Sequence, residues 1–146
     1  TIVFITHDMS IVGSLCDWIA VFYGGIVVEI GPKAEIFDQP SHPYTKALLG
    51  AIPVLGDKVE RLQSVEGEPP NPSNMPDGCP FAPRCDAAMD KCRTGDPPPV
   101  FQLTDARRVR CWLHEEIHDK FVEALHVRML RIKIGDGFAK NHCSSF

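Results

Sequence analysis

The sequence predicts an α/β fold that carries a small, irregular, cysteine-rich extension, and three observations lead to this class. Residues 1–6 are an unbroken run of β-branched and aromatic side chains, which is typical of a strand buried on both faces of a parallel sheet. The runs at 18–23 and 26–30 flank a pair of glycines, which favours a hairpin. The stretch 79–111 holds four of the six cysteines among many prolines, so we expect little regular helix or strand there.

A short helix is expected between the first two strands. Residues 9–16 show a helical pattern, and the polar pair His7-Asp8 precedes it at the carboxyl end of the first strand. Open parallel sheets bind ligands beyond that end of their strands, so the pair is a candidate ligand contact. It also has a purely structural interpretation, in which Asp8 or Ser10 caps the following helix.

Two more helical segments are predicted, at 32–39 and 43–52. The second begins with Pro43, a favourable first-turn residue, and has Ser41 or His42 as its N-cap. His42 is also a candidate metal ligand. Because no cysteine lies near it in the sequence, we interpret it as a capping or packing residue.

Composition and charge narrow the class of protein. The 146 residues are 44% hydrophobic, as in a globular domain, and their net charge of −4 gives no basic field for nucleic-acid binding. We recognise no charged-then-apolar leader and no apolar run of the roughly 18 residues that a membrane-spanning helix needs. Since the first residue is Thr1, we expect the chain to begin inside a larger protein unless an initiator has been removed.

Four cysteines, Cys79, Cys85, Cys92 and Cys111, give the strongest chemical signal. Five, six and eighteen residues separate them in turn, whereas zinc sites favour pairs spaced by about two to four residues. An iron–sulfur cluster accepts thiolates from more loosely spaced loops, so the spacing favours a cluster, then zinc, then disulfides or unligated thiols. The surrounding cations either balance an anionic cluster or form a solvated face: Arg84, Lys91, Arg93, Arg107, Arg108 and Arg110.

A competing metal constellation lies just after the last of these cysteines. His114 and His118 are spaced i, i+4, which places both on one side of a helix near Cys111. We favour the four cysteines over a mixed zinc site, because they already complete a tetrahedral or cluster set.

Three motifs identify a family when they are taken together: Thr-His-Asp at 6–8, His-Pro-Tyr-Thr at 42–45 and Gly-Cys-Pro-Phe-Ala-Pro-Arg-Cys at 78–85. The first, with the following helix and a hairpin of the form G-x-I-V-E-x-G, resembles the histidine-switch region of ABC-transporter ATPase subunits. Val28 is one extra residue in that hairpin. The other two motifs resemble motifs in the ATPase subunits of the oligopeptide and dipeptide importers. The resemblance covers roughly residues 1–116.

The resemblance implies roles for particular residues. His7 is similar to the switch histidine that hydrogen-bonds the γ-phosphate of ATP and helps hold the attacking water, a nucleotide-binding and catalytic role. The four cysteines match a quartet that in this family is associated with a 4Fe-4S cluster, and zinc remains the alternative.

Departures from the family pattern are equally informative. The sequence contains no G-x-x-x-x-G-K-[ST] phosphate loop (Walker A), no Ser-Gly-Gly-Gln signature and no strand ending in Asp-Glu (Walker B) before His7. ATP and Mg²⁺ are therefore expected to bind only together with a missing N-terminal half. Whether the chain counts as an enzyme is left open, and alone it should not hydrolyse ATP.

The resemblance also divides the chain. Residues 1–39 correspond to the C-terminal end of an ABC nucleotide-binding domain, and 40–116 to the importer-type extension with the cysteine quartet, in which 53–78 reads as an extended linker. Residues 117–146 are a helical tail of unassigned origin, with a strand-like alternation at 131–134.

Two functions follow from these features. The first is a fragment of the ATP-hydrolysing subunit that energises peptide import, working with a second ATPase subunit and membrane permease subunits. Its place would be peripheral, on the cytoplasmic side of the plasma (inner) membrane, with no nucleic acid involved. The alternative is a stand-alone zinc or iron–sulfur interaction or sensor module without ATPase activity.

Overall fold

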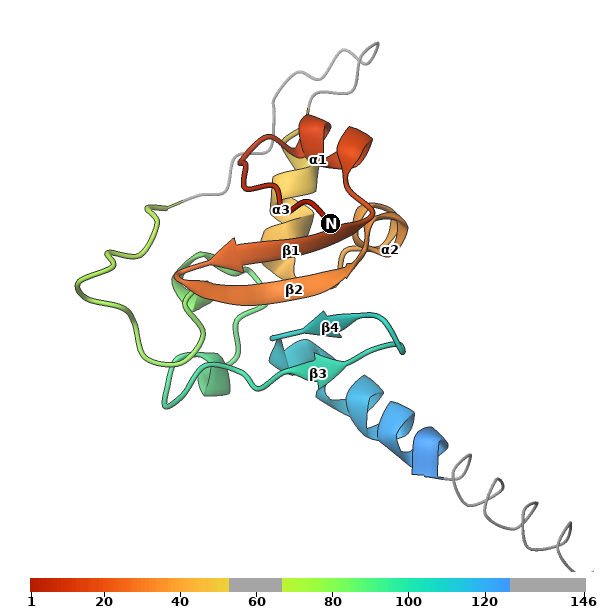
Figure 1. The fold of residues 1–146 in the computed structure, drawn as a ribbon. Coiled ribbons are helices and arrows are strands. Elements are labelled where there is room, and N and C mark those ends of the chain that lie inside the picture. Colours follow the sequence, from red (N-terminus) through yellow and green to blue (C-terminus); the bar gives the residue numbers. More distant parts are fainter. Residues whose placement is uncertain (53–66, 127–146) are drawn as a thin grey trace, which may run out of the picture.

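The computed structural model describes residues 1–52 and 67–126 (Figure 1). Its helices are α1 (Met9–Leu15), α2 (Lys33–Asp38) and α3 (Pro43–Gly50), and its short 3₁₀ turns are η1 (Ala82–Arg84), η2 (Asp90–Cys92) and η3 (Trp112–His114). Its strands are β1 (Trp18–Tyr23), β2 (Ile26–Pro32), β3 (Phe101–Gln102) and β4 (Arg108–Val109). A further helix covers residues 115–126. The mixture of helix and strand predicted from the sequence is therefore present.

Strands β1 and β2 form the predicted hairpin. Gly24 and Gly25 have φ angles of 55° and 80°, the left-handed conformations that a two-residue type I′ turn requires. The antiparallel pairing shifts register between Val21 and Phe22, which leaves Val28 as a β-bulge. The extra residue noticed in the sequence is thus absorbed by a bulge, and its side chain is buried.

The hairpin is extended into a four-stranded sheet by the cysteine-rich segment. The strand order is β1-β2-β4-β3, and every pairing among the described strands is antiparallel. Glu29 pairs with Val109, and the backbone N–H of Arg110 donates to the carbonyl of Val28 at 2.8 Å. The sequence did not predict β3 and β4, because two residues are too short to show a periodic pattern.

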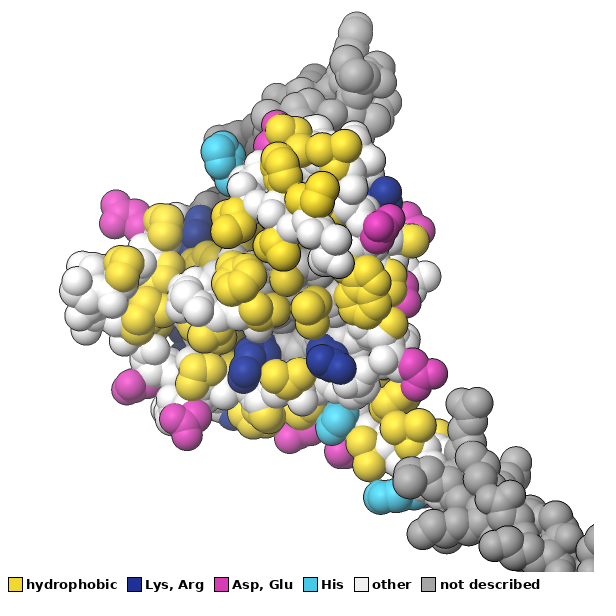
Figure 2. Space-filling view, in the orientation of Figure 1, with side chains coloured by type: hydrophobic (Ala, Val, Ile, Leu, Met, Phe, Trp, Pro, Cys, Tyr) yellow, Lys and Arg dark blue, Asp and Glu magenta, His cyan; other side chains and the backbone are white. Residues whose placement is uncertain are grey.

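Residues 1–6 do not form a strand, so that prediction is wrong for the structure described here. Ile2, Val3 and Ile5 are 89%, 85% and 95% exposed. A strand needs partners for its backbone hydrogen bonds, and none of the described strands pairs with this segment. In Figure 2 hydrophobic side chains gather over β1, whose outward residues include the exposed Trp18 and Phe22.

The core lies on the opposite face of the hairpin. Ile19, Val21 and Tyr23 are buried and alternate with exposed neighbours along β1, the period-two pattern of a strand with one packed face. The ring centroid of Tyr23 lies 4.5 Å from that of Tyr44 on α3 and 5.1 Å from that of Phe81 in the cysteine-rich segment. The hairpin, α3 and the cysteine-rich segment therefore share one core.

The predicted helices at 9–16, 32–39 and 43–52 are confirmed as α1, α2 and α3. Neither of the two described stretches contains a helix with both the length and the apolar character needed to cross a membrane. Most of the predicted linker and the strand-like alternation at 131–134 lie outside the described residues.

Candidate functional site

The first candidate, His7, is exposed at the start of α1. Its neighbour Asp8 is the N-cap of that helix and accepts hydrogen bonds from the backbone N–H groups of Ser10 (2.8 Å) and Ile11 (3.3 Å). These two bonds lower the pKa of Asp8. The capping interpretation therefore holds for Asp8, and the catalytic role of His7 stays a prediction.

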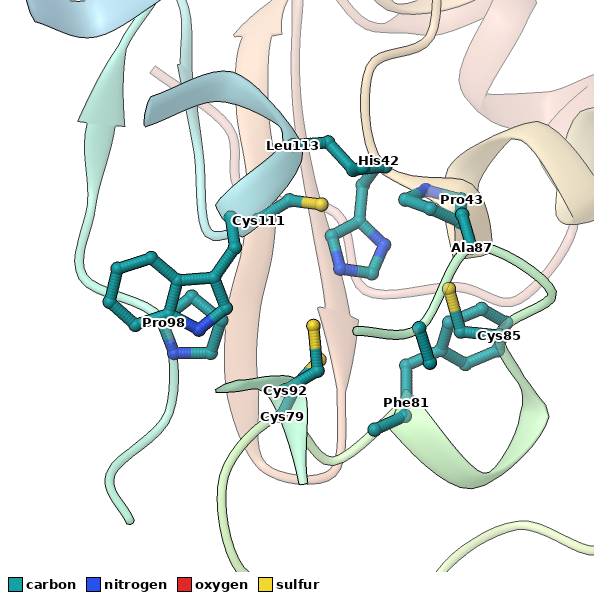
Figure 3. A pocket seen from close by; sticks show the side chains of 13 residues that line it. His42, Pro43, Cys79, Phe81, Cys85, Ala87, Cys92, Pro98, Cys111 and Leu113 are labelled. Carbon is teal, nitrogen blue, oxygen red and sulfur yellow. The ribbon is translucent and has the colours of Figure 1, made fainter. Parts of the chain in front are cut away.

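The second candidate is the cysteine quartet, which the fold brings to one place. Cys79, Cys85, Cys92 and Cys111 all line a single cavity, and Figure 3 shows them grouped around it. Cys79 and Cys85 lie on either side of η1, Cys92 ends η2, and Cys111 follows β4. All four are free thiols. Residues as far apart as 79 and 111 thus meet because β4 joins the sheet beside β2.

Backbone hydrogen bonds close the loop that carries the first three cysteines. The N–H of Gly78 donates to the carbonyl of Gly95 (2.7 Å), and the N–H of Cys79 donates to the carbonyl of Cys92 (2.8 Å). Gly78 has a φ of 72°, a conformation that is free of strain only for glycine. A Cβ at this position would lie 2.5 Å from the Cys92 carbonyl oxygen.

Gly78→Ala should therefore destabilise the chain and spread Cys79 and Cys92 apart. Left-handed backbone strain contributes about 1–3 kcal/mol, and the clash with Cys92 adds to it. Gly95→Ala is the matched control, because its φ is 71° but its Cβ would meet no described residue within 4 Å. Urea denaturation of both variants measures the difference. Equal losses would show that the close approach of Gly78 to Cys92 does not matter.

The electrostatics of the cavity disfavour thiolates that lack a compensating cation. Burial raises the pKa of Cys79 and of Cys85. Burial also raises the pKa of Cys111 to about 11, and repulsion from the other thiolates of the quartet adds to that shift. Charged sulfurs here consequently need a nearby positive charge, such as a metal ion.

The geometry does not itself show a metal centre. Within the part of the chain that the structure describes, no group of three or more His, Cys, Asp or Glu side chains is arranged so that it could hold a metal ion. Neither the 4Fe-4S cluster nor zinc is therefore shown, and what the structure supports is the shared cavity. The cationic side chains expected near the sulfurs mostly contact oxygen atoms: Arg84 donates to Tyr23 Oη, Arg107 to Glu29 and Arg110 to the Pro98 carbonyl.

The competing histidine constellation is not assembled. His114 Nε2 lies 3.1 Å from the carbonyl oxygen of Ser41, and His118 Nδ1 accepts the backbone N–H of Gln102 at 2.9 Å. Neither histidine lines the cavity that the four cysteines share.

His42 lines that cavity as well, a position that its sequence interpretation as a capping or packing residue did not predict. Its Nδ1 caps α3 by accepting the N–H of Tyr44 at 3.0 Å, as the capping interpretation predicted. The ring is 1% exposed, and burial lowers its pKa to about 4, so it is neutral at ordinary pH. Only the folded chain brings it beside cysteines that lie at least 37 residues further along the sequence.

A buried ion pair fixes the position of the cavity. Glu29 of β2 accepts the N–H of Ser41 through Oε1 and that of His42 through Oε2, both at 2.9 Å. Arg107 Nη2 donates to the same carboxylate at 2.6 Å and also to the carbonyl of Gln39. One carboxylate therefore holds together the hairpin, the start of α3 and the segment before β4.

Comparisons with known proteins agree with the motifs. Residues 28–92 match the family described as "Oligopeptide/dipeptide transporter, C-terminal region". The chain is 44% identical over 116 residues to the oligopeptide transport ATP-binding protein AppD of Bacillus subtilis (strain 168), which covers 80% of this chain and 35% of AppD. It is 40% identical over 115 residues to OppD, the oligopeptide transport ATP-binding protein of Haemophilus influenzae, covering 79% of this chain and 35% of OppD.

A third relative is the dipeptide transport ATP-binding protein DppD of Bacillus subtilis (strain 168), 40% identical over 116 residues, which cover 80% of this chain and 34% of DppD. The chain thus spans about a third of the length of the curated relatives it matches. Its motifs, the matching family model and these relatives agree that it corresponds to the C-terminal part of an ATP-binding subunit of the oligopeptide/dipeptide transporter family.

Proposed function

We propose that this chain is the C-terminal part of the ATP-hydrolysing subunit of a peptide importer, and that it supplies His7 to the nucleotide site. The observation that carries the proposal is the family match, which spans the His-Pro-Tyr-Thr helix and three of the four cysteines. In this proposal an N-terminal part of the same subunit carries the phosphate loop, the signature motif and the catalytic carboxylate. ATP and Mg²⁺ bind mainly to that part.

His7 is exposed. Its side chain is therefore accessible to a nucleotide bound by the N-terminal part of the subunit. Phosphoryl-transfer sites work by positioning and by stabilising charge on the transferred group. An imidazole N–H that donates to the γ-phosphate serves both purposes. The Asp8 cap holds the backbone just after His7 at the start of α1.

The partners follow from the same proposal. In this proposal the chain's subunit works with a second ATPase subunit and with membrane permease subunits, and the relatives named for oligopeptide and dipeptide transport support a role in transport. The assembled subunit would lie peripherally on the cytoplasmic side of the membrane. Nothing in the charge of the chain calls for nucleic acid.

The DNA upstream of Thr1 tests the proposal directly. An in-frame phosphate loop, signature motif and strand ending in Asp-Glu are expected there, in that order. A stop codon close upstream, with a start codon at or near Thr1, would remove the ATPase role and leave the stand-alone metal module as the better function.

For the quartet we propose a 4Fe-4S cluster, with zinc as the alternative. The donor chemistry fits, because four thiols face one cavity and four thiolates are the usual ligands of such a cluster. The cavity has a volume of about 10 Å³, about enough for one water molecule. The loops that carry the thiols must therefore move outward to admit the cluster.

The test is to measure the iron, zinc and acid-labile sulfide content of the full chain after purification without oxygen. These contents show which group the quartet holds. We expect about four irons and four sulfides per chain, with the brown colour lost on Cys→Ser at any of the four positions. Cys16→Ser is the matched control, since Cys16 is also a free thiol but does not line the cavity. About one zinc without sulfide would reject the cluster and favour the zinc alternative.

A further inference from the structure

Two buried ring nitrogens on the cavity wall have no hydrogen-bond partner among the described residues, 1–52 and 67–126. They are Nε2 of His42 and Nε1 of Trp112, and both residues line the cavity beside the cysteines. His42 is almost completely buried. In Figure 3 its imidazole points into the space between Cys111 and the Cys79–Cys92 pair.

Hydrogen bonding fixes which ring nitrogen of His42 carries the proton. Its Nδ1 accepts the backbone N–H of Tyr44, so that nitrogen has a free lone pair and no proton. A neutral imidazole then carries its proton on Nε2, which makes Nε2 a donor rather than a metal ligand. Trp112 Nε1 is a donor in any state.

Buried donors without acceptors are unfavourable, because folding removes their hydrogen bonds to water without replacing them. Two such donors on the wall of a cavity lined by four thiols point to an electron-rich acceptor inside it. The sulfur atoms of a thiolate-bound group are acceptors of this kind, and hydrogen bonds to them are one of the ways in which a protein sets the reduction potential of a cluster.

We propose that His42 donates a hydrogen bond from Nε2–H to a sulfur of the group held by Cys79, Cys85, Cys92 and Cys111. The inference rests on the cluster proposed above. His42 thus connects the start of α3, which its Nδ1 caps, to the group held by the quartet. Because the bond stabilises the more negative, reduced state, it raises the reduction potential.

His42→Asn tests this role in the full chain. Asparagine is a good N-cap, so the Tyr44 N–H keeps an acceptor, but the imidazole edge that faces the sulfurs is gone. His114→Asn is the matched control. His114 is a neighbouring partly buried histidine that contacts the Ser41 carbonyl and does not line the cavity.

Iron and sulfide content and the midpoint potential, followed by electron paramagnetic resonance, are measured on all three proteins. The His42 variant should keep its iron while its redox equilibrium constant falls about tenfold, a shift of about 59 mV to lower potential for a one-electron couple. The His114 variant should match the wild type. An unchanged potential in the His42 variant would overturn the inference and leave the cluster standing, whereas a wild-type chain without iron and sulfide would overturn both.

A second measurement does not depend on a folded variant. Histidine labelled with ¹⁵N in the wild-type chain should show a weak nitrogen coupling to the reduced cluster, as expected across a hydrogen bond. A strong coupling, the sign of direct ligation by a histidine, would reject the donor role. The absence of any nitrogen coupling would reject it as well.

Discussion

Glu29→Ala should lower the free energy of unfolding by about 3–5 kcal/mol, the usual cost of breaking a buried ion pair from one side. The substitution leaves the Arg107 guanidinium buried, with its side chain only 7% exposed, and without its carboxylate. It also removes the acceptor of the Ser41 and His42 backbone N–H groups. The substitution therefore removes at once the contacts that join the hairpin to the start of α3 and to the segment before β4.

The measurement is urea denaturation of the full chain beside a Lys91→Ala control. Lys91 pairs with Glu115 at 2.5 Å, but both side chains are 44% exposed. An exposed pair of this kind contributes about 0–1 kcal/mol. Comparable losses in the two variants would show that burial of the Glu29 pair does not determine its contribution.

In the complete subunit, His7→Ala should reduce kcat for ATP hydrolysis about 10²- to 10³-fold, the effect of removing one donor to the transition state. ATP binding should change little, because the phosphate loop that holds the nucleotide lies in the N-terminal part under this proposal. Steady-state kinetics and a nucleotide-binding titration separate the two effects.

His126→Ala is the control for that experiment, since His126 is exposed on the helix that covers residues 115–126. It should leave kcat unchanged. Full hydrolysis by the His7 variant would remove the switch role. If the variant lost both ATP binding and hydrolysis, His7 would instead contribute to binding the nucleotide before the reaction.

Features that are encoded locally were predicted well from the sequence. The glycine pair specifies the turn of the hairpin, and Pro43 with His42 specifies the start of α3, because these signals act within a few residues. Val28 is one residue more than the hairpin pattern requires, and the structure accommodates it as a bulge.

Features that depend on distant partners were missed. Glu29 and Arg107 are 78 residues apart, and nothing in either local sequence indicates their pairing. The local sequence likewise does not indicate that β4 pairs with β2 or that His42 lies beside the cysteines. The strand predicted at residues 1–6 failed for the converse reason: its pattern is typical of a sheet interior, but no described strand pairs with it.

The long separation within the Glu29–Arg107 pair has a consequence during synthesis. Since Arg107 follows Glu29 by 78 positions, a ribosome adding about 5–20 residues per second makes the arginine about 4–16 s after the glutamate. During that interval the β2 edge later covered by β4 is open to pairing with other nascent chains. Charged side chains on an open edge disfavour such pairing, so we expect Glu29 to hinder it before Arg107 is made and the ion pair forms.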